Sequence, residues 1–192
     1  MKVSQWEMAA ERLRAALRHS AEDTRARRPH HIVVGGKLTM DLTWVTERIA
    51  VGGGIWNADN MAAVVGAGVT HIIDMQIEFD DTELARPYPV EVLWNPVEDD
   101  FQRKPPEVFQ RGVDFALEAL DQEDSKVLIH CAAGVHRAPM MALALLCSLN
   151  WKLGKAMDLI ETKRPVADFP EMYVSSVERF LEQRAVGKPV ER

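Results

Sequence analysis

The sequence has few cysteines: Cys131 and Cys147 are the only two among its 192 residues. Two thiols cannot supply the disulfide framework that small secreted domains need, so we expect a reducing, cytoplasmic location. Long apolar runs are also absent, because the longest one, residues 140–146, is far shorter than the roughly 20 residues that cross a bilayer. The first residues lack the apolar core of a signal peptide, and we expect no membrane partner.

The sequence also lacks an excess of positive charge. Its 23 lysines and arginines face 29 acidic residues, which gives a formal net charge of −6. This charge argues against a protein that binds nucleic acid over its whole surface. Apolar residues make up 47% and charged residues 27% of the chain, the ordinary balance of one compact domain. The sequence does not predict an oligomeric state.

The first 40 residues differ in pattern from the rest. Apolar residues recur at helical spacing from Trp6 to Leu17, which predicts an amphipathic helix. A polar, basic segment follows and is typical of a linker. We therefore expect an N-terminal helix and linker over residues 1–40, the main domain over 41–186 and a tail over 187–192.

Beyond residue 41, segments with the patterns of strands and of helices alternate. Glycines and prolines separate them. Such alternation favours an α/β fold built around one sheet. The predicted strands are residues 42–45, 48–51, 69–73, 90–94 and 126–129, and the predicted helices are residues 57–67, 105–120, 138–150, 153–163 and 171–183.

One loop carries most of the chemical information. The apolar strand at 126–129 leads into His130 and Cys131, and a helix begins near Arg137. Backbone N–H groups in so tight a loop converge on one centre, where the helix dipole adds positive potential, and a tetrahedral phosphate fits there. Gly134 permits the turn. The predicted substrate-binding residues are Ala132, Ala133, Gly134, Val135, His136 and Arg137.

Two side chains of this loop have predicted catalytic roles. Cys131 attacks as a thiolate, which a helix N-terminus and nearby cations stabilise. Arg137 follows six positions later, where its planar fork can hold two phosphate oxygens. A single cysteine is more often a small buried apolar residue, but the accompanying His, Gly and Arg favour catalysis. Cys147 lies well inside the next helix, so we expect it in the core.

These residues form the signature His-Cys-x2-Gly-x2-Arg, and the chain resembles the dual-specificity branch of the protein tyrosine phosphatase family. The resemblance spans residues 43–181 and includes the weaker segments 68–73 and Arg164-Pro165. It implies a single central, mostly parallel sheet flanked by helices. It also implies a phosphocysteine intermediate, phosphate binding by the arginine, and neither a metal nor another cofactor.

A phosphatase of this kind also needs a proton donor. Expulsion of an alkoxide or phenoxide requires an acid, hydrolysis of the intermediate requires a base, and one carboxyl can serve both steps. Three carboxylates occur in residues 95–100, directly after a predicted strand. Family members carry their catalytic aspartate in the corresponding loop. We favour Asp99, with Asp100 as the alternative and Glu98 as a solvated neighbour.

Three further residues have predicted supporting roles. The family pattern suggests that His130 orders the loop by hydrogen bonding, although a merely buried histidine would look the same. His136 has two possible roles: it contacts substrate at the rim of the pocket, or it is a loop residue without a functional contact. Most family members have Ser or Thr after the arginine, whereas this chain has Ala138, as the phosphatases of regenerating liver also do. The missing hydroxyl implies slow release of phosphate from Cys131.

The substrate is less clearly indicated. The variable loop positions Ala132, Ala133 and Val135 carry no charge, whereas phosphoinositide phosphatases of this family often have lysines there. This favours a phosphorylated protein as partner but does not decide between phosphotyrosine and phosphoserine or phosphothreonine. We expect phosphotyrosine ahead of the other two. Phosphoinositide, nucleotide and RNA 5′-phosphate substrates stay open, as does a slow or inactive phosphate-binding module. Two other protein classes fit less well. Low-molecular-weight phosphatases place their Cys-x5-Arg loop near the N-terminus, whereas here the loop follows most of the predicted strands. Rhodanese-like proteins have a loop of another size.

Overall fold

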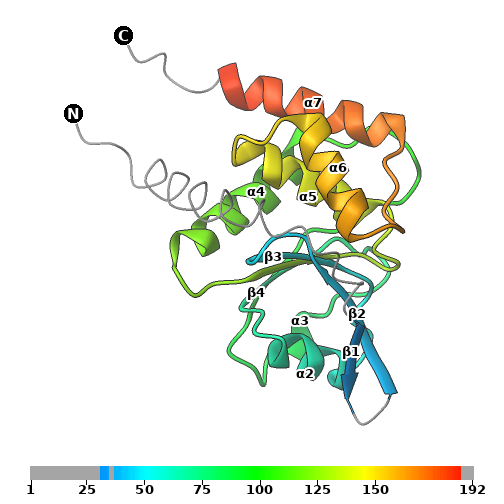
Figure 1. Ribbon diagram of the computed structural model, residues 1–192, viewed down its shortest axis with the longest axis vertical. Coiled ribbons are helices and arrows are strands. Elements are labelled where there is room, and N and C mark those ends of the chain that lie inside the picture. Colours follow the sequence, from blue (N-terminus) through cyan, green and yellow to red (C-terminus); the bar gives the residue numbers. More distant parts are fainter. Residues whose placement is uncertain (1–30, 35–36, 187–192) are drawn as a thin grey trace, which may run out of the picture.

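The sheet of this protein has helices on both faces (Figure 1). The structure is a computed structural model that describes residues 31–34 and 37–186. Six strands form the sheet in the order β1-β2-β3-β6-β4-β5. The helix predicted near the N-terminus and the predicted tail at 187–192 lie outside the described residues.

Four parallel strands form the centre and one edge of the sheet. Strand β6 (Val127–His130) lies between β3 (Ile49–Gly52) and β4 (His71–Asp74), and β5 (Glu91–Trp94) pairs with β4. Every residue of β3, β4 and β6 is buried, as expected for strands covered on both faces. The prediction of a single, mostly parallel sheet is confirmed.

The other edge is antiparallel. Strand β2 (Lys37–Trp44) pairs with β3, and β1 (His31–Val34) pairs with β2. The sheet therefore begins upstream of residue 41, where the predicted main domain starts. Apolar and β-branched runs on both sides of a Gly-Gly pair are typical of a hairpin, although we predict a linker for this segment. The domain division stays a prediction.

The helices cover the two faces unequally. Helices α2 (Ala58–Gly66) and α3 (Thr82–Ala85) lie on one face, where Met61 and Val64 join a core with Ile72 and Leu128. Figure 1 shows the longer helices on the opposite face. These are α4 (Pro106–Asp121), α5 (Arg137–Ser148), α6 (Leu153–Lys163) and α7 (Glu171–Val186).

Helix α5 is the centre of the larger core. Every residue from Arg137 to Leu146 is buried, as the apolar sequence predicts, and α4, α6 and α7 all pack against this helix. Phe109 on α4 stacks with Phe180 on α7 at 5.5 Å between ring centroids. This packing fixes the N-terminus of α5 directly after β6.

The ends of the strands locate the functional loops. Parallel strands place their carboxyl ends at one edge of the sheet, where open α/β sheets bind ligands. The loops that follow β4, β5 and β6 meet at this edge. Cys131 and Gly134 of the signature lie in the loop after β6, His130 ends β6 and Arg137 begins α5. Within residues 31–34 and 37–186, no helix is long and apolar enough to cross a membrane.

Candidate active site

The loop from Cys131 to His136 connects β6 to α5 in a tight turn. Cys131 is 1% exposed, and its Sγ accepts a hydrogen bond from the Gly134 N–H at 3.2 Å. Gly134 has a φ of +65°. A Cβ added at Gly134 would lie 2.3 Å from Nη2 of Arg164 and 2.5 Å from the Gly52 carbonyl oxygen, so only glycine fits there. The loop has the shape that the sequence predicts.

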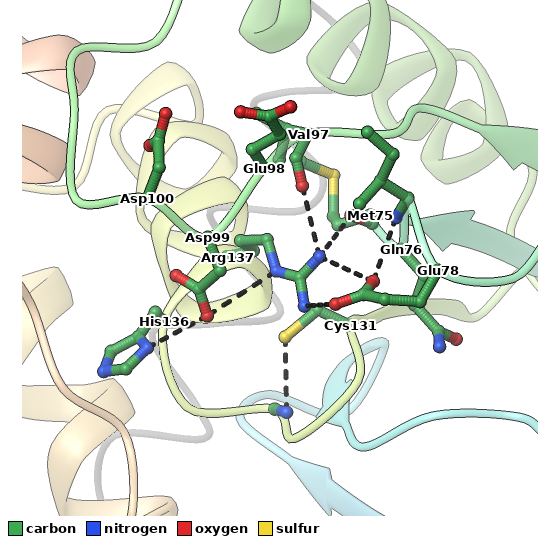
Figure 2. Close-up of polar contacts among 12 residues, drawn as sticks. Met75, Gln76, Glu78, Val97, Glu98, Asp99, Asp100, Cys131, His136 and Arg137 are labelled. Atoms are coloured by element: carbon green, nitrogen blue, oxygen red, sulfur yellow. Dashed lines mark hydrogen bonds and ion pairs between the residues drawn. The ribbon is translucent and has the colours of Figure 1, made fainter.

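Arg137 projects back over this loop and is 2% exposed. Its Nη1 and Nη2 donate to the two carboxylate oxygens of Glu78 at 2.9 and 2.8 Å, and Nη1 also donates to the Val97 carbonyl at 3.1 Å (Figure 2). Burial opposes the charge, but the hydrogen bonds to Glu78 and the charges of Glu78, Cys131 and Asp99 outweigh it and raise the pKa of Arg137. The guanidinium is therefore charged and fixed in direction.

Glu78 is a site residue that sequence analysis missed. It lies in the loop after β4, and its side chain is 44% exposed. The hydrogen bonds from Arg137 lower the pKa of Glu78 below its ordinary value. Glu78 accepts hydrogen bonds from Nη1 and Nη2 of Arg137, so Nε is left facing the loop after β5, and it makes no hydrogen bond to any described residue. Nε is thus available to an oxyanion.

Asp99, the residue predicted as the acid, lies beside Arg137 and His136. Its Oδ1 accepts a hydrogen bond from the Tyr173 hydroxyl at 3.0 Å, and its Oδ2 lies 3.1 Å from His136 Nδ1 and 3.7 Å from Arg137 Nε. Figure 2 shows this carboxylate turned toward the guanidinium.

The alternative acid, Asp100, is engaged elsewhere. Its carboxylate contacts the Lys104 ammonium and accepts the Gln102 N–H at 2.9 Å. The hydrogen bond from Lys104 is the main reason that the pKa of Asp100 falls below its ordinary value. The side chains of Asp100 and Glu98 point away from Arg137 in Figure 2. The geometry therefore favours Asp99.

Aromatic side chains surround Asp99. The Tyr173 ring is buried, and burial is the main cause that raises the pKa of its hydroxyl. Phe101 stacks on Tyr173 at 6.1 Å and meets the His136 ring edge-on at 5.0 Å. Phe101 has a φ of +58°, an uncommon value for a residue with a bulky side chain. No sequence pattern points to Tyr173 or Phe101 as a site residue.

His136 lies at the rim of the loop. Its Nδ1 faces Asp99, and its Nε2 lies 3.3 Å from Oδ2 of Asp168, on the loop before α7. The remaining loop side chains are small: Ala132 and Val135 are half-buried and Ala133 is exposed. Ala138, the first residue after Arg137, is fully buried and carries no hydroxyl toward the loop.

His130 lies behind the nucleophile among carboxylates. Its Nε2 is 3.0 Å from Asp81 Oδ2 and 3.6 Å from Asp74 Oδ1, and all three side chains are fully buried. Within the described ranges these three residues bring their potential metal-ligand atoms within 4.8 Å of one another. Burial, together with the charge of Asp81, raises the pKa of Asp74 to about 7. A proton on Asp74 can therefore neutralise one of the two buried carboxylates, those of Asp74 and Asp81. The absence of a metal stays a prediction.

Comparison with known proteins identifies the family of this chain. A family model described as "Dual specificity phosphatase, catalytic domain" matches residues 57–180. Dual specificity protein phosphatase 5 of Rattus norvegicus is 36% identical over 74 residues, which are 38% of this chain and 19% of that protein. The human protein of the same name is 35% identical over 72 residues and 18% of its length. The chain thus spans about a fifth of these relatives.

Solved structures show the same fold. PTPMT1, in a crystal structure of its complex with PI(5)P, has a TM-score of 0.66 at 19% identity, over 74% of this chain and 95% of that one. Human DUSP28 has a TM-score of 0.65 at 20% identity, over 77% and 99%. At these identities the likeness concerns the fold alone. The family match covers more than half of the sequence and includes the loop around Cys131, and the chain therefore belongs to the dual-specificity phosphatase catalytic domain family.

Proposed function

We propose that this protein hydrolyses phosphomonoesters through a phosphocysteine formed on Cys131, and that its main substrate is phosphotyrosine in proteins, ahead of phosphoserine and phosphothreonine. The observation that carries the proposal is the convergence of three groups on one point. Cys131 Sγ lies at the base of the loop, the Arg137 guanidinium lies over it, and the Asp99 carboxylate faces Arg137 Nε at 3.7 Å.

In the first step, Sγ of Cys131 attacks phosphorus and forms the S–P bond while the P–O bond to the leaving group breaks. Asp99 gives its proton to the departing oxygen. The loop N–H groups and Arg137 hold the remaining phosphate oxygens as charge moves onto them. Glu78 keeps the guanidinium in place through its two hydrogen bonds.

In the second step, water attacks the phosphocysteine and Asp99 takes its proton, so the S–P bond breaks and inorganic phosphate leaves. A hydroxyl beside the sulfur would stabilise the departing thiolate. Ala138 supplies none, and we therefore expect the second step to limit turnover.

The surroundings of the loop support a protein substrate. The loop positions around Cys131 are uncharged, and the nearby loops bring carboxylates: Glu78 contacts Arg137, and Asp168 contacts His136. This negative charge disfavours approach to an anionic membrane surface or a polyphosphorylated headgroup. PTPMT1 shares this fold and its crystal structure is a complex with PI(5)P, so a phosphoinositide phosphatase of the same fold is the second candidate.

The exposed ring of Phe101 supports an aryl phosphate. It lies two residues after Asp99 and against His136, so the group that receives the proton from Asp99 passes beside it. A phenol can pack on this ring, whereas the short side chains of phosphoserine and phosphothreonine reach it less well.

A panel of substrates tests the proposal. Phosphotyrosine and phosphothreonine peptides are compared with phosphoinositide vesicles, with Cys131→Ser as the blank. We expect kcat/KM to be at least tenfold higher for the phosphotyrosine peptide than for the vesicles. Faster hydrolysis of the vesicles would favour the second candidate, and no turnover of any substrate would favour an inactive phosphate-binding module.

A further inference from the structure

Arg164 lies beneath the loop from Cys131 to His136, called the catalytic loop below, and is 1% exposed. It follows the last residue of α6, and its guanidinium points at the outer side of the loop. Nε donates to the Gly134 carbonyl oxygen at 2.7 Å, and Nη2 donates to the Ala133 carbonyl oxygen at 3.3 Å. Arg164 thus holds the carbonyl groups of two successive peptide units of the loop.

Strand β2 holds this guanidinium from the other side. Nη1 donates to Asp41 Oδ1 at 2.9 Å and Nη2 to Asp41 Oδ2 at 2.5 Å, so the pair is bidentate. Nη1 also donates to the Thr43 hydroxyl at 3.1 Å. All three nitrogens of Arg164 are therefore engaged, and the side chain is fixed between β2 and the loop.

The geometry of the peptide bond gives these contacts a consequence for the other side of the loop. In a trans peptide unit the C=O and the following N–H point in opposite directions. When Arg164 holds the Ala133 carbonyl outward, the Gly134 N–H points inward, and it does donate to Cys131 Sγ at 3.2 Å. By the same argument, holding the Gly134 carbonyl outward turns the Val135 N–H toward the phosphate position.

We propose that Arg164 and Asp41 are positioning residues for phosphate binding: by fixing two loop carbonyls outward, they keep the N–H groups of Gly134 and Val135 aimed at the oxyanion. Neither residue touches substrate. The inference rests on the proposed function, because the oxyanion is the phosphate of the substrate. Gly134 is part of the arrangement, since any Cβ there would meet Nη2 of Arg164.

Two variants of the full chain test the proposal. Asp41→Asn keeps the shape of the side chain but removes the charge that holds Arg164, and Arg164→Lys keeps the charge but removes the fork. Asp114→Asn is the matched control, because Asp114 forms another partly exposed pair with an arginine, Arg184, at 2.9 Å between α4 and α7. Replacing Arg164 by alanine is avoided, since a large buried side chain would be lost.

The measurements are the dissociation constant for tungstate, kcat and KM for an aryl phosphate, and the midpoint of thermal unfolding. For Asp41→Asn we expect tungstate to bind about tenfold more weakly and kcat/KM to fall by about 10- to 100-fold, at temperatures where the variant is fully folded. Arg164→Lys should show at least the same losses. Asp114→Asn should bind tungstate as the unaltered chain does.

The outcomes separate the inference from the proposed function. Variants that are folded and less stable but bind tungstate unchanged would overturn the positioning role and leave a purely structural one. If the unaltered chain hydrolyses aryl phosphate and both variants do so equally well, the inference is also overturned. If the unaltered chain hydrolyses no phosphoester, the proposed function fails, whereas a loss of tungstate binding in the two variants would still support the positioning role.

Discussion

The hydroxyl of Tyr173 donates a hydrogen bond to Oδ1 of Asp99 at 3.0 Å, and this bond ties the loop after β5 to helix α7. The same hydroxyl accepts the Phe101 N–H at 3.2 Å. Tyr173 therefore fixes both the direction of the Asp99 carboxylate and the path of the chain just beyond it. The Asp99 carboxylate is thus held by a residue 74 positions later in the sequence.

Replacing Tyr173 by phenylalanine should lower kcat by about fivefold, because one hydrogen bond that orients Asp99, worth about 1 kcal/mol, is lost while the ring still packs. The only other tyrosine, Tyr88, lies on the opposite side of the sheet with the smaller core. Tyr88→Phe is thus the control. Equal kcat values for the two variants would argue that Asp99 is oriented by other contacts.

Asp99→Asn should lower turnover of a phosphotyrosine peptide by about 100-fold or more, because no proton reaches the leaving oxygen. Formation of phosphocysteine from a substrate with a good leaving group should be much less affected. Asp100→Asn, whose carboxylate faces Lys104 instead, is the matched control and should change turnover by less than about threefold. A larger loss for Asp100→Asn than for Asp99→Asn would reverse the assignment of the acid.

Ala138→Ser should raise the steady-state rate several-fold, because the new hydroxyl can hydrogen-bond the departing thiolate of Cys131. Stopped-flow traces of the unaltered chain with an aryl phosphate should show a burst followed by a slower linear phase. The ratio of burst to linear rate should fall in the variant. A linear time course without a burst in the unaltered chain would show that phosphate release is not limiting.

The buried Asp74 makes stability depend on pH. Burial raises its pKa from 3.8 to about 7 in the folded state, whereas unfolding restores the ordinary value. Between about pH 4 and pH 7 the folded chain keeps this proton whereas the unfolded chain releases it, so the free energy of unfolding falls as pH rises. Above about pH 7 both states have released the proton, and the free energy of unfolding falls no further from this cause.

Asp74→Asn removes this cost while its amide oxygen can still accept the Gln76 N–H, which donates to Asp74 Oδ1 at 2.8 Å. The free energy of unfolding is measured by denaturant for the variant and for the unaltered chain at pH 5 and at pH 8. The advantage of the variant should be larger at pH 8 than at pH 5, by about 1–3 kcal/mol. Asp59→Asn, at an exposed position on α2, is the control. A stability difference that is the same at both pH values would contradict the account.

The sequence predicts those parts of the molecule whose causes are local. Helix α4 begins at Pro106, where a proline suits the first turn, and the apolar pattern gives every parallel strand. The catalytic loop could be identified because Cys131, Gly134 and Arg137 lie within seven residues, and their backbone and helix context determines what they do.

The contacts missed by sequence analysis join residues far apart in the chain. Glu78 reaches Arg137 across 59 positions and Asp41 reaches Arg164 across 123. A glutamate or aspartate in a polar loop has no pattern that distinguishes it from a solvated one, so only packing shows its partner. Helix α3 has four residues, which is too short for a helical period to be recognised.

The most direct test of the central claim is to trap the phosphoenzyme. The full chain is mixed with a ³²P-labelled aryl phosphate, quenched in acid within the burst phase and digested to locate the label. We predict label on the peptide that contains Cys131 in the unaltered chain and in Cys147→Ser. Burial raises the pKa of Cys147 to about 11, so that thiol stays protonated and is the matched control. Cys131→Ser should carry no label; persistent label in that variant, or none in the unaltered chain, would contradict the account.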